Sequence, residues 1–206
     1  AGAFLALALV LATTLAVPGK AHAAFNDMAD SYPAAQELGS YEARIDGSQL
    51  PDGAYRVQAR TTSRMCIMYT DPSDAEARDS KEQAIISVSG GQMVAVFYIS
   101  KAYTHLYFGT MEQAAAATNA NGTDASAYIA GDPDEDYVPH LFTLPISALN
   151  DPITVATYSG GDKGIENGKW YTREFVFKMS EAELRAIRAA ADADSGSGDD
   201  SSSGDD

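Results

Sequence analysis

The sequence is poor in cysteine, histidine and positive charge. Its 206 residues include one Cys and three His, and 14 basic residues stand against 29 acidic ones, for a formal net charge of −15. One Cys cannot form a disulfide within the chain, so a hydrophobic core must stabilise the fold. The acidic excess argues against nucleic acid and anionic membrane surfaces as partners.

The sequence also lacks the short motifs of common catalytic sites. It has no Gly-rich phosphate loop, no nucleophile elbow and no zinc-ligand spacing. Cys66 has no His in a recognisable motif and is interpreted as a small buried side chain. His105 is interpreted as a solvated strand residue, and the acidic run 131–137 as a loop without EF-hand spacing. We therefore expect a protein that is not an enzyme.

The two ends of the chain differ from its middle. Residues 1–23 hold the apolar run AFLALALVLATTLAV and then AHA, a small-x-small cleavage site, which indicates a signal peptide truncated at its start. Residues 24–44 read as a lead-in segment, and 195–206 as a disordered Gly/Ser/Asp spacer. We expect an exported protein on the cell surface or cell wall, without stable membrane insertion of the mature domain.

Residues 45–179 consist of short β-rich runs separated by turn signals. Tyr55, Val57 and Ala59 alternate with polar residues, and Ser89-Gly90-Gly91 joins two apolar runs as a hairpin. Ser180 followed by Glu183 forms a capping box that predicts a C-terminal helix over 180–194. The predicted fold is an all-β, immunoglobulin-like antiparallel β-sandwich of seven or eight strands with a short C-terminal helix.

The last predicted strand lies in the stretch ENGKWYTREFVF, residues 166–177. A spacing of two places Tyr171 on the same face as Phe175 and Phe177, which should point into the core. A phenol at the edge of that face is either a core residue whose hydroxyl finds a hydrogen-bond partner, or a ligand. The residues alone leave both interpretations open.

Three stretches in order resemble the NEAT (near-iron transporter) domain, the haem-binding immunoglobulin-like sandwich of Gram-positive surface proteins. They are TTSRMCIMYTDP (61–72), LFTLPISALNDPITVATYS (141–159) and KWYTREFVF (169–177). The first is similar to a short helix of the family that contains Ser and Met. The other two are similar to its paired penultimate strands and its last strand. The resemblance covers residues 45–179.

The resemblance implies a haem site and a set of residues for it. Tyr171 takes the place of the iron-ligating tyrosine, and Ser63 and Met65 take the place of the short helix at the rim. The further haem-binding residues that we expect are Arg64, Tyr69, Lys169 and Arg173. At position 167, where the family usually has a second, supporting tyrosine, this sequence has Asn.

The chemistry of these residues is compatible with ferric haem. A phenolate is one of the axial donors that proteins use for haem iron, and an unperturbed Tyr titrates near 10. Arg173 or Lys169 could favour the phenolate, while Ser63 and Arg64 could hydrogen-bond propionates. The predicted function is capture of ferric haem for iron acquisition, with haem, haemoproteins or surface haem-relay proteins as partners. The alternative is an adhesive or structural module that binds a host protein or glycan without haem.

Overall fold

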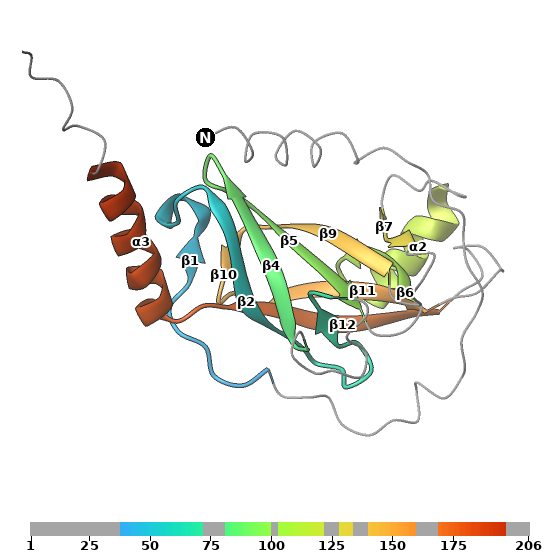
Figure 1. Ribbon diagram of the computed structural model, residues 1–206. Coiled ribbons are helices and arrows are strands. Elements are labelled where there is room, and N and C mark those ends of the chain that lie inside the picture. Colours follow the sequence, from blue (N-terminus) through green and yellow to red (C-terminus); the bar gives the residue numbers. More distant parts are fainter. Residues whose placement is uncertain are drawn as a thin grey trace, which may run out of the picture.

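The computed structural model describes residues 38–71, 81–99, 103–121, 128–133, 140–159 and 169–196 (Figure 1). The expected signal peptide, most of the lead-in segment and residues 197–206 of the expected spacer lie outside these ranges. Within them, no helix is long and apolar enough to cross a membrane.

The described residues form a curved antiparallel sheet whose strands follow the order β7-β6-β11-β12-β2-β4-β5-β9-β8, with β3 paired to β5. Seven of its strands have six or more residues: β2 Gly53–Thr61, β4 Gln83–Ser89, β5 Gln92–Ile99, β6 Tyr103–Phe108, β9 His140–Ile146, β11 Ile153–Ser159 and β12 Lys169–Lys178. The others are β3 Met68–Tyr69, β7 Ile129–Ala130 and β8 Asp132–Pro133, while β1 Ile45–Asp46 and β10 Ala148–Leu149 form a separate pair.

Local sequence signals account for the long strands. In β2, Val57 and Ala59 are buried whereas Arg56 and Gln58 are exposed, as the alternation requires. The β4–β5 hairpin turns at Gly90 and Gly91, whose φ angles of 55° and 76° are costly for residues with a Cβ.

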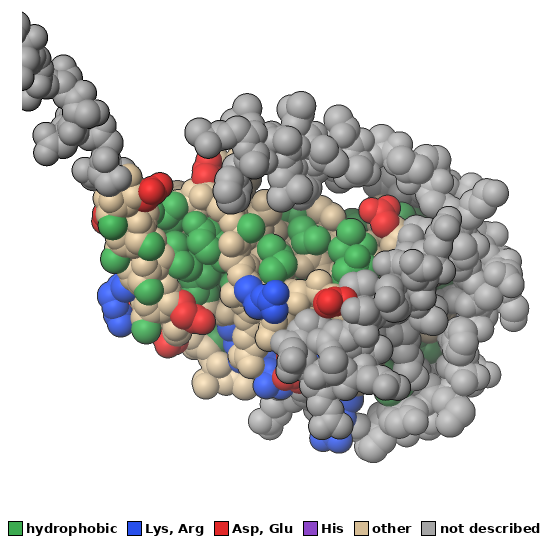
Figure 2. All heavy atoms as spheres, viewed as in Figure 1, with side chains coloured by type: hydrophobic (Ala, Val, Ile, Leu, Met, Phe, Trp, Pro, Cys, Tyr) green, Lys and Arg blue, Asp and Glu red, His purple; other side chains and the backbone are tan. Residues whose placement is uncertain are grey.

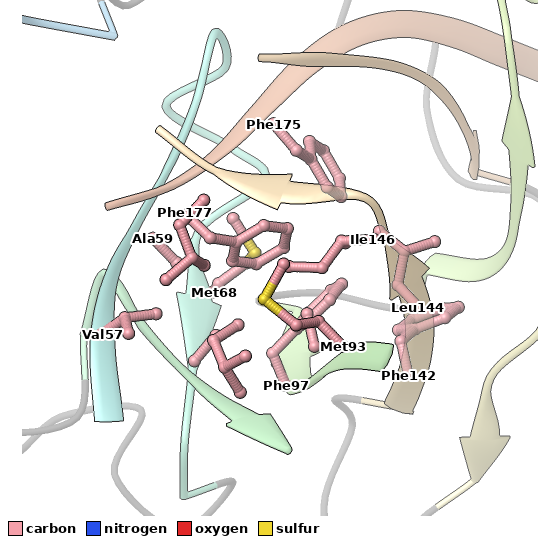
Figure 3. Close-up of a cluster of buried hydrophobic side chains, with 14 of the residues drawn as sticks. Val57, Ala59, Met68, Met93, Phe97, Phe142, Leu144, Ile146, Phe175 and Phe177 are labelled. Carbon is pink, nitrogen blue, oxygen red and sulfur yellow. The ribbon is translucent and has the colours of Figure 1, made fainter. Parts of the chain in front are cut away.

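The sheet folds over on itself and encloses the core. Phe97 of β5 lies 6.1 Å from Phe175 and 5.8 Å from Phe177, measured between ring centroids, although β12 and β5 are not hydrogen-bonded neighbours. Figure 3 shows these rings pointing toward one another among the side chains of β2, β9 and the other core strands. The antiparallel sandwich predicted from the sequence is confirmed, and its two layers are continuous through β2 and β4.

A seam at Gly131 joins the two ends of the sheet. β7 pairs with β6 and β8 pairs with β9, and the two short strands are separated only by Gly131. A Cβ on Gly131 would lie 2.7 Å from Cζ of Phe142 and 2.8 Å from Cβ of His140. Only glycine permits so close an approach of this backbone to β9.

The two α-helices of the described residues lie toward opposite ends of the sheet (Figure 1). α2 (Met111–Asn121) contacts β11 and β12, and α3 (Glu181–Gly196) follows β12 directly. The capping box is present, because Ser180 N–H donates to Glu183 at 2.7 Å and Glu183 N–H donates to Ser180 Oγ at 3.2 Å. Leu184 of α3 joins the core, and Figure 2 shows hydrophobic side chains on the surface beside this helix.

The 3₁₀ turn η2 (Gly47–Gln49) is linked to α3, because Arg188 of that helix donates a hydrogen bond to the Gln49 carbonyl.

Two expectations about the interior need correction. His105 is not solvated: it is 4% exposed and its ring lies edge-on to Tyr158, 5.9 Å between centroids. On the outer face of β6, β11 and β12, aromatic side chains and α2 form a second buried cluster. His105 points away from the main core, and it is buried because this cluster covers it. Residues 62–67 form turns and not a helix.

Candidate functional site

β12 places Tyr171 on the interior face of the sheet. Its backbone pairs with Thr157 of β11, and its side chain is 7% exposed. Phe175 and Phe177, on the same face, belong to the main core, whereas Trp170 belongs to the aromatic cluster on the other face. The phenol therefore lies where the core ends along β12, as the alternation predicts.

Arg173 extends over the ring of Tyr171. The guanidinium carbon lies 5.1 Å from the ring centroid, a cation–π contact. One guanidinium nitrogen donates to the carbonyl of Thr172 at 3.0 Å, and the buried Nε atom has no hydrogen-bond partner among the described residues. A cation placed beside a phenol favours the phenolate over the neutral form.

Tyr103, the first residue of β6, joins this pair from another strand. It is 5% exposed, and Arg173 lies near enough to its phenol to act on the pKa of Tyr103. Burial raises the pKa of Tyr103, and this outweighs the lowering by Arg173. Tyr103 is therefore neutral at physiological pH.

Cys66 completes the group of side chains around Arg173. It is fully buried, and desolvation raises its thiol pKa to about 12 although the charge of Arg173 acts in the opposite direction. Both acids near the guanidinium, Cys66 and Tyr103, thus remain protonated. The charge of Arg173 is left for Tyr171 or for an incoming anionic ligand.

The turn that carries Cys66 is tied to β12 next to Arg173. The single hydroxyl proton of Thr61 is shared between the carbonyls of Ser63 and Cys66, which lie 2.9 and 2.7 Å from Oγ. Thr62 N–H donates to the carbonyl of Glu174 at 3.1 Å, and Glu174 N–H donates to Thr62 Oγ at 3.0 Å. These bonds bring the 61–67 turn to the side of the sheet where Arg173 lies.

The residues expected at the rim lie on this turn. Ser63 and Met65 are half-buried and Arg64 is exposed. The hydroxyl of Ser63 accepts a hydrogen bond from Met65 N–H at 3.2 Å, so it supports the turn itself. The structure thus brings the turn to Arg173, with Arg64 as its exposed cation.

Tyr69 and Lys169 lie elsewhere. Met68 of β3 is in the core, so its neighbour Tyr69, paired with Tyr98, points to the other face of the sheet. Lys169 is exposed at the start of β12, opposite Ser159. Position 167 lies outside the described residues.

No local sequence pattern identified Tyr103 as part of this group. β6 pairs with β11, which pairs with β12, and the register shifts between Tyr158 and Ser159 where Tyr103 meets Ser159. The register shift determines the face of β6 on which the Tyr103 side chain lies. No local sequence pattern specifies such a shift. Tyrosine spacing within one strand could not have found this contact.

The group brings a phenol oxygen and a guanidinium together on the interior face of β12. No set of three His, Cys, Asp or Glu side chains that could hold a metal ion occurs in the part of the chain that the structure describes. The chemistry that remains is a phenol oxygen next to a cation.

Comparisons with known proteins found similarity only among solved structures. No family model matches the chain, and no curated protein matches it. One similar structure is the NEAT5 domain of IsdX2, a B. anthracis hemophore, in complex with heme (10% identity, TM-score 0.40). Another is a point mutant of that domain in complex with heme (11% identity, TM-score 0.41). Each alignment covers 64% of this chain and 99% of the other. Both are NEAT domains, the family that the sequence resembles.

Proposed function

We propose that this domain binds ferric haem, with the phenolate of Tyr171 as the axial ligand to iron, and that it serves haem capture outside the cell. The observation that carries the proposal is the guanidinium of Arg173 over the Tyr171 ring at 5.1 Å. A cation over the ring face favours loss of the phenol proton. An anionic oxygen donor in turn favours ferric iron.

Other groups around Tyr171 suit the remaining parts of haem. The porphyrin is large and apolar, and Met65 on the neighbouring turn is a flexible apolar side chain. Arg64 is exposed, so its guanidinium can reach a propionate in bidentate fashion. Haem would supply the iron, and the chain would supply the donor oxygen, the cation and the propionate contacts.

Export and surface attachment belong to the same proposal. The apolar run and AHA site of residues 1–23, together with the Gly/Ser/Asp residues 195–206, support secretion and display on a spacer. Secretion would place the domain where free or protein-bound haem is the iron source.

Hemin titration of the purified protein tests the proposal. We expect a Soret band and a phenolate-to-iron charge-transfer band in the wild type. Tyr171→Phe should lose the charge-transfer band and keep its melting temperature, because the ring remains and only the donor oxygen is removed. Tyr107→Phe is a matched control, since Tyr107 packs with the aromatic cluster on the other face. Equal spectra for Tyr171→Phe and the wild type would overturn the assignment of the ligand.

A second candidate is a protein-binding module. The outer positions of β4, β5 and β9 hold half-buried apolar side chains in cross-strand pairs, Ile85 with Val96 and Leu141 with Tyr98. An apolar sheet face of this kind suits a protein partner. If the wild type gives no Soret band, this reading predicts that Val96→Lys abolishes partner binding while Tyr171→Phe leaves it intact.

A further inference from the structure

The outer face of β4, β5 and β9 carries no charged side chain. These three strands are fully described, and each alternates buried core residues with outward-facing ones. The outward positions hold aliphatic, aromatic, hydroxyl and amide side chains and one proline, among them the half-buried Ile85, Val96 and Leu141. In a chain with 29 acidic and 14 basic residues, so neutral a face suits contact with another protein surface.

The two margins of this face carry opposite charges. On β2, the exposed Arg56 pairs with Ile85 of β4, which pairs with Val96 of β5. On β8, the exposed Asp132 pairs with Leu141 of β9. Directly opposite residues of antiparallel strands share a face, so Arg56 and Asp132 both belong to the outer face. The order β2-β4-β5-β9-β8 places β5 in the middle, two strands from either margin.

Both marginal charges are available to a partner. Arg60, on the same face of β2, already pairs with Glu82 at 3.0 Å, whereas Arg56 donates to the neutral amide of Gln83 at 3.1 Å. Neither Arg56 nor Asp132 makes an ion pair within the described part of the chain. An outside carboxylate can therefore meet Arg56, and an outside cation can meet Asp132.

A second copy of the chain supplies both of these groups. A two-fold axis that runs parallel to β5, between the two molecules, places β5 over β5 and β2 over β8 of the other copy. The contact between the margins then forms twice, as an isologous interface requires. Along the strands, Arg56 is level with Val96 and Asp132 with Tyr98, two residues further on β5. The offset is about 7 Å, which the long side chain of arginine can span.

We propose that the outer face of β4, β5 and β9 binds a second copy of this chain, with Arg56 of each copy beside Asp132 of the other. The neutral centre lets two molecules, each with a net charge of −15, meet without like charges between them. Its apolar side chains, half-buried in one molecule, are covered in the pair. β12 is not part of this face, so pairing does not depend on haem binding.

Sedimentation equilibrium of charge-reversal variants tests the pairing without haem. The wild type should form a dimer that dissociates on dilution. Arg56→Asp and Asp132→Arg should each weaken the dimer about tenfold or more, because each places like charges together at both symmetric contacts. An equimolar mixture of these two variants should form dimers as the wild type does, since both contacts then join opposite charges again.

Two substitutions on α3 are the matched controls. Arg185→Asp and Asp194→Arg change the net charge by the same amounts at exposed positions outside this face, and they should leave dimerisation unchanged. Melting temperatures of all variants should be alike, because the substituted side chains are exposed. Single variants at Arg56 and Asp132 that dimerise as the wild type does would overturn the proposed arrangement.

The double variant Arg56→Asp/Asp132→Arg completes the test. It should dimerise as the wild type does, because the two charges have only changed places. A double variant as weak as either single variant would overturn the contact between the margins. A wild type that remains monomeric at every concentration would overturn the inference and leave the face to a foreign protein. Hemin titration of Arg56→Asp tests the proposed function separately, since loss of the dimer should leave the Soret band unchanged.

Discussion

The guanidinium carbon of Arg173 lies 5.1 Å from the centre of the Tyr171 ring, and the two residues are neighbours on the interior face of β12. Side chains at i and i+2 of a strand share a face, but an arginine at such a position usually extends to water. Here the guanidinium of Arg173 lies over the Tyr171 ring and close to Tyr103. The charge is thus concentrated where the proposed ligand lies.

Replacing Arg173 should weaken haem binding without unfolding the domain. Arg173→Met keeps the apolar stem and removes the charge, and we expect about tenfold weaker hemin binding from the lost cation–π contact and hydrogen bonds. Arg173→Lys should lie between, because it keeps a charge but not the planar fork. Arg185→Met on α3, where the exposed Arg185 pairs with Glu181 one turn earlier, is the control. Unchanged hemin affinity in Arg173→Met would contradict the role given to the cation.

The buried thiol of Cys66 should make the fold sensitive to alkali. Its pKa is raised from an ordinary 9.0 to about 12 by burial, so between these values the unfolded chain loses a proton that the folded chain keeps. Stability from this group is complete below pH 9 and is lost as pH rises toward 12, by up to about 1.4 kcal/mol per pH unit.

Urea unfolding at several pH values measures this loss. The free energy of unfolding of Cys66→Ala should fall less steeply with pH above 9 than that of the wild type, although its value at pH 7 is lower because a small cavity remains. Tyr103→Phe should also flatten the dependence, since the pKa of Tyr103 is raised too. Parallel curves for the wild type and Cys66→Ala would show that the thiol is exposed to solvent.

Asn150 should be among the most sensitive positions outside the site. Its φ is 58°, its side-chain amide donates to the carbonyls of Ala43 and Met179 at 2.9 and 2.8 Å, and its Oδ1 accepts from Met179 N–H at 3.0 Å. Asn150→Gly tolerates the φ but loses these bonds, at a cost of about 2–3 kcal/mol. Asn150→Ala should cost about 1 kcal/mol more, because it adds the strain of a positive φ. Equal unfolding free energies for the two variants would show that backbone strain plays no part.

Gly131→Ala should disrupt the seam of the sheet. The added methyl would overlap Phe142 and His140 at less than 3 Å, and both neighbours are buried. We expect a loss of about 3 kcal/mol or more, by overpacking and displacement of β7 and β8. Gly53→Ala is the control, because its new methyl would first meet the movable hydroxyl of Tyr55 at 3.1 Å. Similar melting temperatures for the two variants would contradict the tight seam.

The parts of the fold that were predicted correctly are those with strong local signals. The alternation of β2, the Gly90-Gly91 turn and the Ser180–Glu183 box each specify a structure within a few residues. The seam at Gly131 was missed because two-residue strands have no periodic pattern. The prediction of a solvated His105 was wrong, because α2 and its aromatic cluster cover the outer face of the sheet there.

The site was predictable only along β12. Period-two spacing gave the direction of Tyr171, and Arg173 followed from it as a neighbour on the same face. The contact with Tyr103 depends on the order of three strands and on a register shift, neither of which a single sequence encodes locally. Tyr69 was grouped with the site by its place in a motif, but the pairing of β3 with β5 turns it to the other side.

The seam at Gly131 also governs how the domain meets copies of itself. In the described part of the sheet, β7 and β8 each pair with only two residues, so β6 and β9 keep short stretches of unpaired backbone. Pro145 lies in the open stretch of β9 and has no N–H to donate, which hinders the addition of a foreign strand. The five residues 129–133 form both β7 and β8, and so cover the edge of β6 and the edge of β9. If this segment detached, both edges would be exposed at the same time. If molecules exchange strands, we expect the exchange to involve β7 and β8, whose pairing is limited to two residues each.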